Sequence, residues 1–231
     1  FSIDIIMSLF LNIIIKFSNM ELYKCDKYDK IRMGRDYDGG YVIYDDLEYD
    51  VIIGCGISND ISFEEMFVDK YKCDSIVFDG TISKLPKHKF NHKWNKKNVY
   101  QGTLDLLLKQ YDKIFLKIDI EGSEWEFFKD VDLHNVSQMV VEFHSGIKYP
   151  NLDMDILKKI EQTHYLIHIH GNNYRKKQYK IYDKIIHSVF EATYINKNLC
   201  KEYIWKCEYN YNDELDMPNN KNKSDIKNMC L

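Results

Sequence analysis

The chain has 231 residues, of which 45% are apolar and 14% aromatic, enough to build a sizeable core and to exclude a mostly disordered protein. Its formal net charge of −4 gives no case for a nucleic-acid partner held by overall positive charge. We therefore predict a main domain over residues 32–209, an N-terminal helical or apolar extension at 1–31 and a polar, flexible tail at 210–231.

Residues 5–15, IIMSLFLNIII, form an apolar run that is shorter than the roughly 20 residues needed to span a bilayer. We predict a packed helix here. A truncated membrane anchor, or an interfacial helix attaching residues 1–20 to a membrane, is the alternative. The six cysteines form no CxxC pair, which favours free thiols in a cytoplasmic compartment over a Cys200–Cys207 disulfide.

Downstream, residues 35–46 are typical of a hairpin or a turn that enters a short strand. Strand-like runs follow at 50–54, 75–79, 113–119, 138–144, 165–170 and 203–209, with a weaker one at 98–101. Helix-like patterns lie between or beside them at 61–71, 103–111, 123–131 and 152–163. This alternation predicts a mostly parallel α/β sheet, whose ligands bind beyond the carboxyl ends of the strands.

Two signals at the first strand ends indicate a nucleotide. Gly54 and Gly56 follow the first run, allow a tight turn and precede a helix whose first N–H groups are free. Asp79 ends the second run about 25 residues later, where a Rossmann-like site places an acid on the ribose hydroxyls. Each signal alone fits an ordinary turn, but the pair favours a binding site.

Ionisable side chains end the next two strands. Asp119 and Glu121 close one of them, and Glu142 and His144 share a face at the end of the other. Buried carboxylates are costly unless they are paired or face water, so we predict a cleft here. Structural pairs, such as Lys117 with Asp119 or Glu142 with His144, are the alternative.

Two further groups of residues could bind a ligand. His168 and His170 lie on one face of a strand and could chelate a metal completed by Asp119, Glu142 or His144; a metal is possible but is not predicted. Residues 84–97 carry six lysines and two histidines, which could meet phosphates, although a solvated loop is favoured.

The blocks GRDYDGGYVI, GCGISNDISFE, FDGTI, TLDLL, FLKIDIEGSEWE, VVEFH and HIHGNN resemble, in this order, the FkbM-related class I methyltransferases over residues 32–175. KIDIEGSEWE is the most specific of them. The resemblance implies a Rossmann-like, mostly parallel seven-stranded sheet with helices on both faces and a reversed final hairpin. It also implies a transferase that uses S-adenosyl-L-methionine (SAM), commonly for O-methylation of a hydroxyl acceptor such as a sugar, a glycan or a small molecule.

The resemblance also implies roles for individual residues. Cofactor-binding residues would be Gly54, Cys55, Gly56, Ser58, Asp60, Asp79, Gly80, Gly102, Thr103 and Asp119, with Asp79 on the ribose and Gly102 and Thr103 near the adenine. Catalytic candidates are Asp119, Glu121, Glu142 and His144, and Asp119 is the expected base or acceptor clamp.

Two other functions are compatible with the sequence. The alternative is a nucleotide-binding or nucleotide-sugar-binding domain without turnover, and its best support is that Ile52 and Ser58 stand where the family motif has an acid and a third glycine. The third hypothesis is a metal-dependent hydrolase built on His168 and His170.

Overall fold

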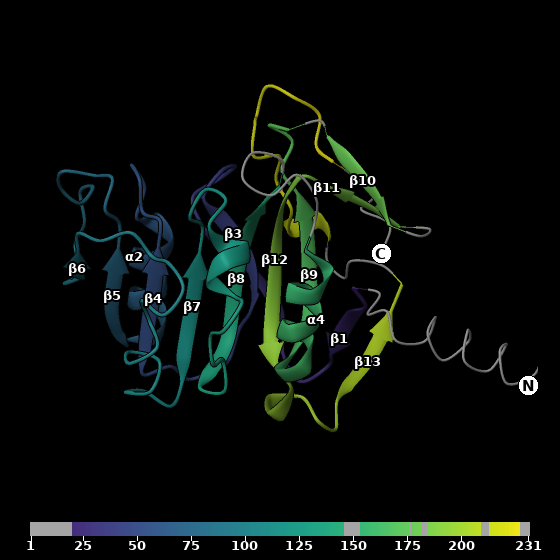
Figure 1. Ribbon diagram of the computed structural model, residues 1–231, viewed down its shortest axis with the longest axis horizontal. Coiled ribbons are helices and arrows are strands. Elements are labelled where there is room, and N and C mark those ends of the chain that lie inside the picture. Colours follow the sequence, from purple (N-terminus) through teal and green to yellow (C-terminus); the bar gives the residue numbers. More distant parts are fainter. Residues whose placement is uncertain (1–19, 146–152, 176, 182–183, 209–212, 227–231) are drawn as a thin grey trace, which may run out of the picture.

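The chain forms one large sheet with helices on both faces and two small hairpins, as Figure 1 shows for the computed structural model. The structure describes residues 20–145, 153–175, 177–181, 184–208 and 213–226. The helices are α2 (Ser62–Tyr71), α3 (Glu124–Phe127) and α4 (Met154–Thr163), with short 3-10 turns at η1 (Lys197–Leu199) and η2 (Asp213–Leu215). The large sheet contains, in spatial order, β13 (Ile204–Cys207), β1 (Leu22–Cys25), β9 (His164–Gly171), β12 (Val189–Asn196), β8 (Val136–His144), β7 (Ile114–Ile118), β4 (Val51–Cys55), β5 (Asp74–Phe78) and β6 (Lys93–Asn95). The hairpins are β2 (Lys30–Gly34) with β3 (Gly40–Tyr44), and β10 (Gln178–Ile181) with β11 (Lys184–His187).

The order of the strands confirms the predicted α/β sheet and its reversed final hairpin. β6, β5, β4, β7 and β8 run parallel to one another, whereas β12 runs antiparallel between β8 and β9. The expected number of seven strands is wrong, because the sheet has nine. The two extra strands lie at one edge, where β13 pairs with β1 and β1 pairs with β9.

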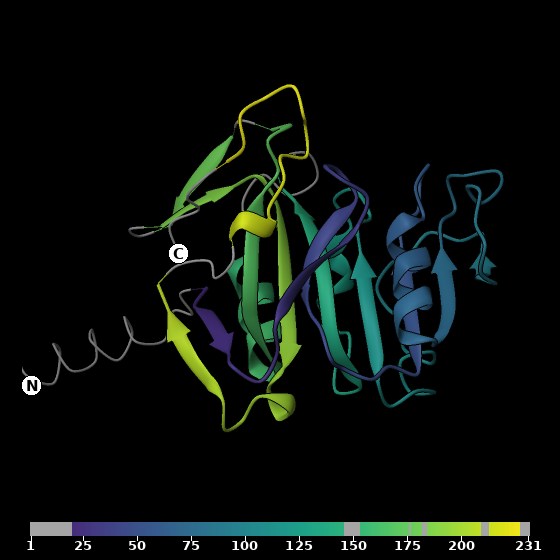
Figure 2. The ribbon, with the colours of Figure 1, turned by 180° about the vertical axis from the view of Figure 1, so that it is seen from behind.

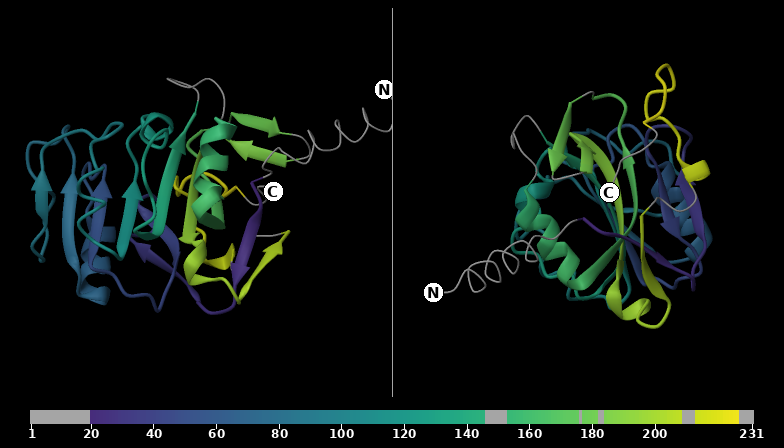
Figure 3. Two further views of the ribbon diagram at one scale, coloured as in Figure 1. Left: turned by 60° about the horizontal axis from the view of Figure 1, so that its bottom comes forward. Right: turned by 90° about the vertical axis from the view of Figure 1, so that its right-hand side faces the viewer.

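Aromatic side chains fill both sides of the sheet. α2 and the β2–β3 hairpin cover one face, and α3 and α4 cover the other (Figure 2 and Figure 3). On the first face, the ring centroids of Phe67 and Phe115 lie 4.4 Å apart. On the second face, those of Trp125 and Phe143 lie 4.7 Å apart. Because the central strands are covered on both sides, they appear in the sequence as continuous apolar runs.

Two predicted elements are wrong. Residues 98–101 form no strand, and the edge strand is instead β6, which lies within the predicted basic loop 84–97. Residues 103–111 form a series of turns in place of a helix. Leu104 and Leu108 are nevertheless buried, so the apolar spacing of this segment is used for packing against the sheet.

The described parts of the predicted extension and tail contact the large sheet. β1 begins at Leu22 and belongs to the large sheet, whereas the apolar run 5–15 lies outside the described residues. Residues 213–226 do not extend away from the fold but lie across the ends of β9 and β12, at the top of Figure 1. The five described cysteines are free thiols, so Cys200 and Cys207 form no disulfide.

Candidate active site

Two adjoining cavities lie at the carboxyl ends of β4, β5, β7 and β8. The larger cavity has a volume of about 440 Å³ and the smaller one about 310 Å³. Gly56, Ser58, Asp119 and Glu121 line both cavities. The site predicted for this edge of the sheet is therefore built around the turn after β4 and the end of β7.

Gly56 is fixed at the junction of the two cavities by its backbone. Its φ of +83° lies in the left-handed region, and a Cβ atom built there would collide with the carbonyl oxygen of Asp119. The Gly56 N–H donates to the Phe78 carbonyl at 2.9 Å, which ties the turn to β5. Only glycine lets the turn pass this close to the end of β7.

Asp79 holds the same turn from the end of β5. One carboxylate oxygen accepts hydrogen bonds from the backbone N–H groups of Ile57 at 3.0 Å and Ser58 at 2.7 Å. The other accepts from the Thr81 N–H at 2.7 Å and the Thr81 hydroxyl at 2.6 Å. Burial favours a raised pKa, but the bonds from Thr81, Ser58 and Ile57 outweigh it and hold the pKa of Asp79 below its ordinary value. The charged carboxylate therefore shapes the turn.

Ser58 occupies the position where the family motif has its third glycine. Its φ of +50° is in the left-handed region, which most residues other than glycine avoid. The Asp79 bond to its N–H stabilises this conformation at a residue other than glycine.

Lys117 lies beneath the larger cavity and has a structural partner. Its Nζ lies 3.2 Å from Glu64 Oε1 and donates to the Gly56 carbonyl at 3.2 Å. Burial opposes the charge of Lys117, but Glu64 and Asp119 outweigh it and raise the pKa of the ammonium group. The direct ion-pair partner of Lys117 is thus Glu64, while Asp119 acts on Lys117 through its charge.

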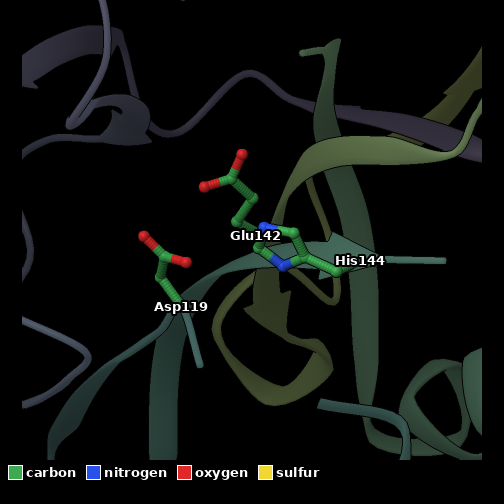
Figure 4. Close-up of side chains that lie close together, drawn as sticks. All are labelled: Asp119, Glu142 and His144. Atoms are coloured by element: carbon green, nitrogen blue, oxygen red, sulfur yellow. The ribbon is translucent and has the colours of Figure 1, made fainter. Parts of the chain in front are cut away.

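Three ionisable side chains converge on the larger cavity, as Figure 4 shows. Asp119 follows β7, and Glu142 and His144 come from β8; one ligand atom of each lies within 4.8 Å of the others. Burial raises the pKa of Asp119 to about 6, against the opposing charges of Lys117 and His144. Burial and the neighbouring Asp119 raise the pKa of Glu142 well above its ordinary value. The cavity is therefore a place where carboxylate charge is poorly compensated.

His144 is oriented by a buried acid that sequence reasoning missed. Its Nδ1 lies 3.2 Å from Glu124 Oε1, and Glu124 is 0% exposed. The Glu124 carboxylate also accepts hydrogen bonds from the backbone N–H groups of Ile120 and Gly122, at 3.0 and 3.1 Å. Burial opposes the charge of His144, but Glu124 and Glu142 outweigh it and raise the pKa of the imidazole to about 10.

Most of the predicted site residues line the two cavities. Those that do are Gly56, Ser58, Asp60, Asp79, Asp119, Glu121, Glu142 and His144. Those that do not are Gly54, Cys55, Gly80, Gly102 and Thr103. Gly54 instead leaves room for a neighbour, since a Cβ atom there would lie 2.6 Å from Glu64 Oε1. The residues that sequence reasoning missed are Arg35, Tyr41, Thr81, Asn98, Val99, Tyr100, Ile120, Asn172 and Arg175, among others.

The histidines of β9 bind the C-terminal segment. His168 Nε2 lies 2.7 Å from Asp216 Oδ1, and its Nδ1 lies 3.3 Å from the Nζ of Lys30. His170 Nε2 lies 3.0 Å from Asp225 Oδ1, and its Nδ1 lies 3.5 Å from a Glu191 oxygen. Because the Nε2 atoms of both histidines contact acids of the C-terminal segment, the pair does not form the centre on which the hydrolase hypothesis depends.

These contacts make the stability of the fold depend on pH. Burial opposes the charge of His170, but Asp225 and Glu191 outweigh it and raise its pKa from 6.5 to about 10. The stabilising effect is therefore complete below pH 6.5 and is lost as the pH rises towards 10. We expect His170→Gln to lower the free energy of unfolding by about 1.5–3 kcal/mol at pH 6, and by progressively less up to pH 10, in urea titrations.

The matched control is His134→Gln, since His134 has an acidic partner, Asp132, but its side chain is 76% exposed. This variant should follow the wild type within about 0.5 kcal/mol at every pH. A His170→Gln difference that stayed constant from pH 6 to pH 10 would show that the charge of His170 does not stabilise the docked segment.

The lysine-rich stretch 84–97 is fixed in part by buried contacts. His92 Nδ1 lies 2.7 Å from the Ser75 hydroxyl and its Nε2 lies 2.8 Å from Glu65 Oε1, while Trp94 Nε1 donates to the Asp79 carbonyl at 3.2 Å. Lys97 lines the smaller cavity. Across the part of the chain that the structure describes, no helix is long and apolar enough to cross a membrane.

Comparison with known proteins identifies the family. The family model described as a methyltransferase FkbM domain matches residues 37–176, more than half of the chain. No curated protein matches the sequence. The match covers the β3 hairpin strand, the glycine turn, the Asp79 region, Asp119, Glu142 and His144, and it confirms the resemblance seen in the sequence motifs. The chain belongs to the FkbM methyltransferase family.

Proposed function

We propose that the protein is a SAM-dependent methyltransferase that methylates a hydroxyl oxygen of a sugar, a glycan or a small molecule. The observation that carries this proposal is the junction at Gly56 and Asp119, where a cavity with both apolar and polar walls meets another lined mainly by polar and charged groups. A donor in the first cavity and an acceptor in the second would come together at this junction.

The smaller cavity fits the adenosine half of SAM. Phe78, Val99 and Ile120 supply apolar surface for a flat base, and Asn98 and Tyr100 supply hydrogen-bonding groups. Gly56 has no side chain, so its backbone can lie close to a ligand at the junction of the two cavities. The methionine half of SAM would lie there. When bound, SAM supplies a methyl group on a positively charged sulfur and leaves as the neutral thioether.

The larger cavity fits an acceptor rich in hydroxyl groups. Arg35, Asp38, Asn172 and Arg175 line it with hydrogen-bond donors and acceptors of both charges. Such a wall can form many hydrogen bonds to a polar molecule, and sugar hydroxyls can both donate and accept hydrogen bonds. This polarity supports a sugar or another hydrophilic acceptor over an apolar one.

Asp119 is the group proposed to take the acceptor proton. Its carboxylate lies at the junction, and the Tyr41 hydroxyl is its nearest described donor at 3.5 Å. The acceptor oxygen would take the methyl group as the carbon–sulfur bond of bound SAM breaks, with the bonding electrons left on sulfur. Asp119 would accept the hydroxyl proton. Glu142 and His144 stand on the acceptor side of the same cavity, where they orient the hydroxyl.

Ile52, which stands where the family motif has an acid, is part of the core. Ile52 is fully buried and belongs to the apolar cluster that contains Phe63, Phe67 and Phe115. An apolar side chain here supports the packing of α2 against the sheet, and Ile52 lines neither cavity. The alternative of a nucleotide-binding domain without turnover therefore gains no support from Ile52.

The proposal predicts binding of S-adenosylhomocysteine, the demethylated product of SAM. At 100 times its dissociation constant the product should stabilise the fold by about 2.7 kcal/mol, measured as a rise in the unfolding temperature. Asp79→Ala should weaken this binding at least tenfold, because the turn that separates the two cavities loses its hydrogen-bond acceptor.

Asp105→Ala is the matched control for this titration, since Asp105 is exposed and lines neither cavity. It should bind the product as the wild type does. If the wild-type protein shows no shift at millimolar product, it is not a SAM-dependent enzyme. Binding without methyl transfer to any hydroxylated acceptor would favour the alternative without turnover.

A further inference from the structure

We propose that Asp119, Glu142 and His144 bind a divalent metal ion in the larger cavity (Figure 4). The binding of the ion follows from these three side chains and their surroundings alone. Its role in methyl transfer rests on the proposed function.

The three side chains already lie close to the geometry of a metal site. Their ligand atoms are within 4.8 Å of one another and come from the ends of two adjacent parallel strands, β7 and β8. Ligands that are each about 2.1 Å from one ion are at most about 4.2 Å apart, so small side-chain rotations suffice to close the site. The remaining positions around the ion face the cavity and are open to water or to an acceptor.

Both carboxylates have oxygens that no described group satisfies. Glu142 is 5% exposed; Asn172 donates to its Oε1 at 2.5 Å, and its Oε2 accepts no hydrogen bond from the described residues. Among the described residues, the hydrogen-bond donor found for the Asp119 carboxylate is the Tyr41 hydroxyl, which lies 3.5 Å from Oδ2. These oxygens therefore face the larger cavity, where a cation could bind both carboxylates.

The cationic side chains of the cavity are mostly engaged elsewhere. Arg35 lies 3.2 Å from Asp60 and 3.7 Å from Asp38, and Lys117 lies 3.2 Å from Glu64. With Glu121 Oε2 3.6 Å from His144 Nε2, the larger cavity holds three carboxylates, those of Asp119, Glu121 and Glu142, around one imidazole. A small divalent ion is the species that matches this excess of negative charge in a space of this size.

The contact between His144 and Glu124 points to a metal in a second way. Glu124 is fixed by the N–H groups of Ile120 and Gly122, and it accepts from Nδ1 of the His144 ring. Histidines that bind metals almost always donate their other ring N–H to a carboxylate or carbonyl in this manner. The nitrogen proposed to bind the ion is Nε2, which now lies 3.6 Å from Glu121 Oε2.

Two carboxylates and one imidazole suit Mn²⁺, and Mg²⁺ less well, because Mg²⁺ takes oxygen ligands in preference to nitrogen. A hydroxyl oxygen bound to such an ion loses its proton more readily than a free hydroxyl. The ion would thus hold the acceptor and lower its pKa, while the Asp119 oxygen that does not bind the metal accepts the proton. The proposed acceptor side of the cavity and the metal site are then the same place.

The test is a titration of the full chain, treated with chelator and then dialysed, with Mn²⁺ alone and electron paramagnetic resonance as the readout. We expect one bound Mn²⁺ per chain and, in the pulsed spectrum, a coupling to one imidazole nitrogen. Glu142→Gln and Asp119→Asn should each weaken Mn²⁺ binding at least tenfold, and His144→Gln should remove the nitrogen coupling. Glu124→Gln should weaken binding about 10- to 100-fold, because it releases the ring.

Glu126→Gln is the matched control, since Glu126 lies on α3 two residues from Glu124 and lines neither cavity. It should bind Mn²⁺ as the wild type does. Absence of Mn²⁺ binding by the wild type, or binding without a nitrogen coupling, overturns the proposal and does not depend on how well the variants fold. Product binding, measured without metal, tests the proposed function separately, so either proposal can fail while the other stands.

Discussion

Replacing Gly56 by alanine is expected to abolish product binding and to lower the free energy of unfolding by about 3 kcal/mol or more. The left-handed φ of +83° alone costs an L-residue about 1–2 kcal/mol. The new methyl group would also collide with the Asp119 carbonyl oxygen, so either the turn or the end of β7 must move. Because both cavities meet there, any such movement changes the site. Urea unfolding and calorimetric titration with S-adenosylhomocysteine measure the two effects.

Gly102→Ala is the matched control for this substitution. Gly102 has a φ of +78°, but the nearest atom to a Cβ built there is an Asp105 oxygen at an ordinary 3.7 Å. The free energy of unfolding of this variant should fall only by the conformational cost of about 1–2 kcal/mol, and its affinity for the product should stay the same. Normal product binding by Gly56→Ala would place the cofactor elsewhere. A loss of binding in Gly102→Ala would support the adenine role that the family resemblance implies for this residue.

The sequence was informative wherever the sheet depends on continuous apolar runs. The strands β4, β5, β7, β8 and β9 were predicted within a few residues because buried parallel strands consist of such runs. β12 was missed, although it lies between β8 and β9. Its strand carries Glu191 and Thr193, whose partners are Asn219 and the Val42 carbonyl, far away in the sequence. Polar side chains inside a buried strand are tolerated because of such partners, and a local stretch of sequence does not reveal partners that are distant along the chain.

The role of the C-terminal residues was hidden for the same reason. A segment rich in Asn, Asp and Lys has the composition of a solvated tail, and apolar periodicity cannot reveal that it docks. The docking depends on single polar contacts, such as Asn220 N–H to Asn173 Oδ1 at 2.6 Å and the bonds of Asp216 and Asp225 to the β9 histidines. Residues 213–226 therefore fix the two histidines that the sequence had offered as possible metal ligands.

In the candidate site, the sequence indicated the acids at the strand ends but not the groups that hold them. Asp119, Glu142 and His144 were predicted because parallel strands end at one edge of a sheet. Glu124 and Glu64 belong to helices, where a buried acid has the same sequence signature as an exposed one. Asp79 was predicted as a ribose ligand, and its bonds to Ile57, Ser58 and Thr81 add a role in shaping the turn.

Asp119→Asn is expected to lower the rate of methyl transfer by about 10²–10⁴-fold, the usual contribution of a positioned general base. Product affinity should change by less than about threefold, because the backbone at Asp119, which packs against Gly56, is unaltered. The measurement is the transfer of labelled methyl from SAM to the best acceptor in a panel of sugars and small hydroxylated molecules. Asp105→Asn, outside both cavities, is the control that should keep full turnover.

The stability of the Asp119→Asn variant separates a loss of chemistry from a loss of fold. Burial raises the pKa of Asp119 from 3.8 to about 6, so at pH 7 the folded protein carries a charge that the unfolded chain accommodates more easily. Removing the charge should leave the unfolding temperature equal to that of the wild type or higher. A variant that is equally stable, binds the product and transfers methyl at the wild-type rate would show that Asp119 is neither base nor acceptor clamp. A variant that unfolds early would instead mean that the carboxylate supports the end of β7.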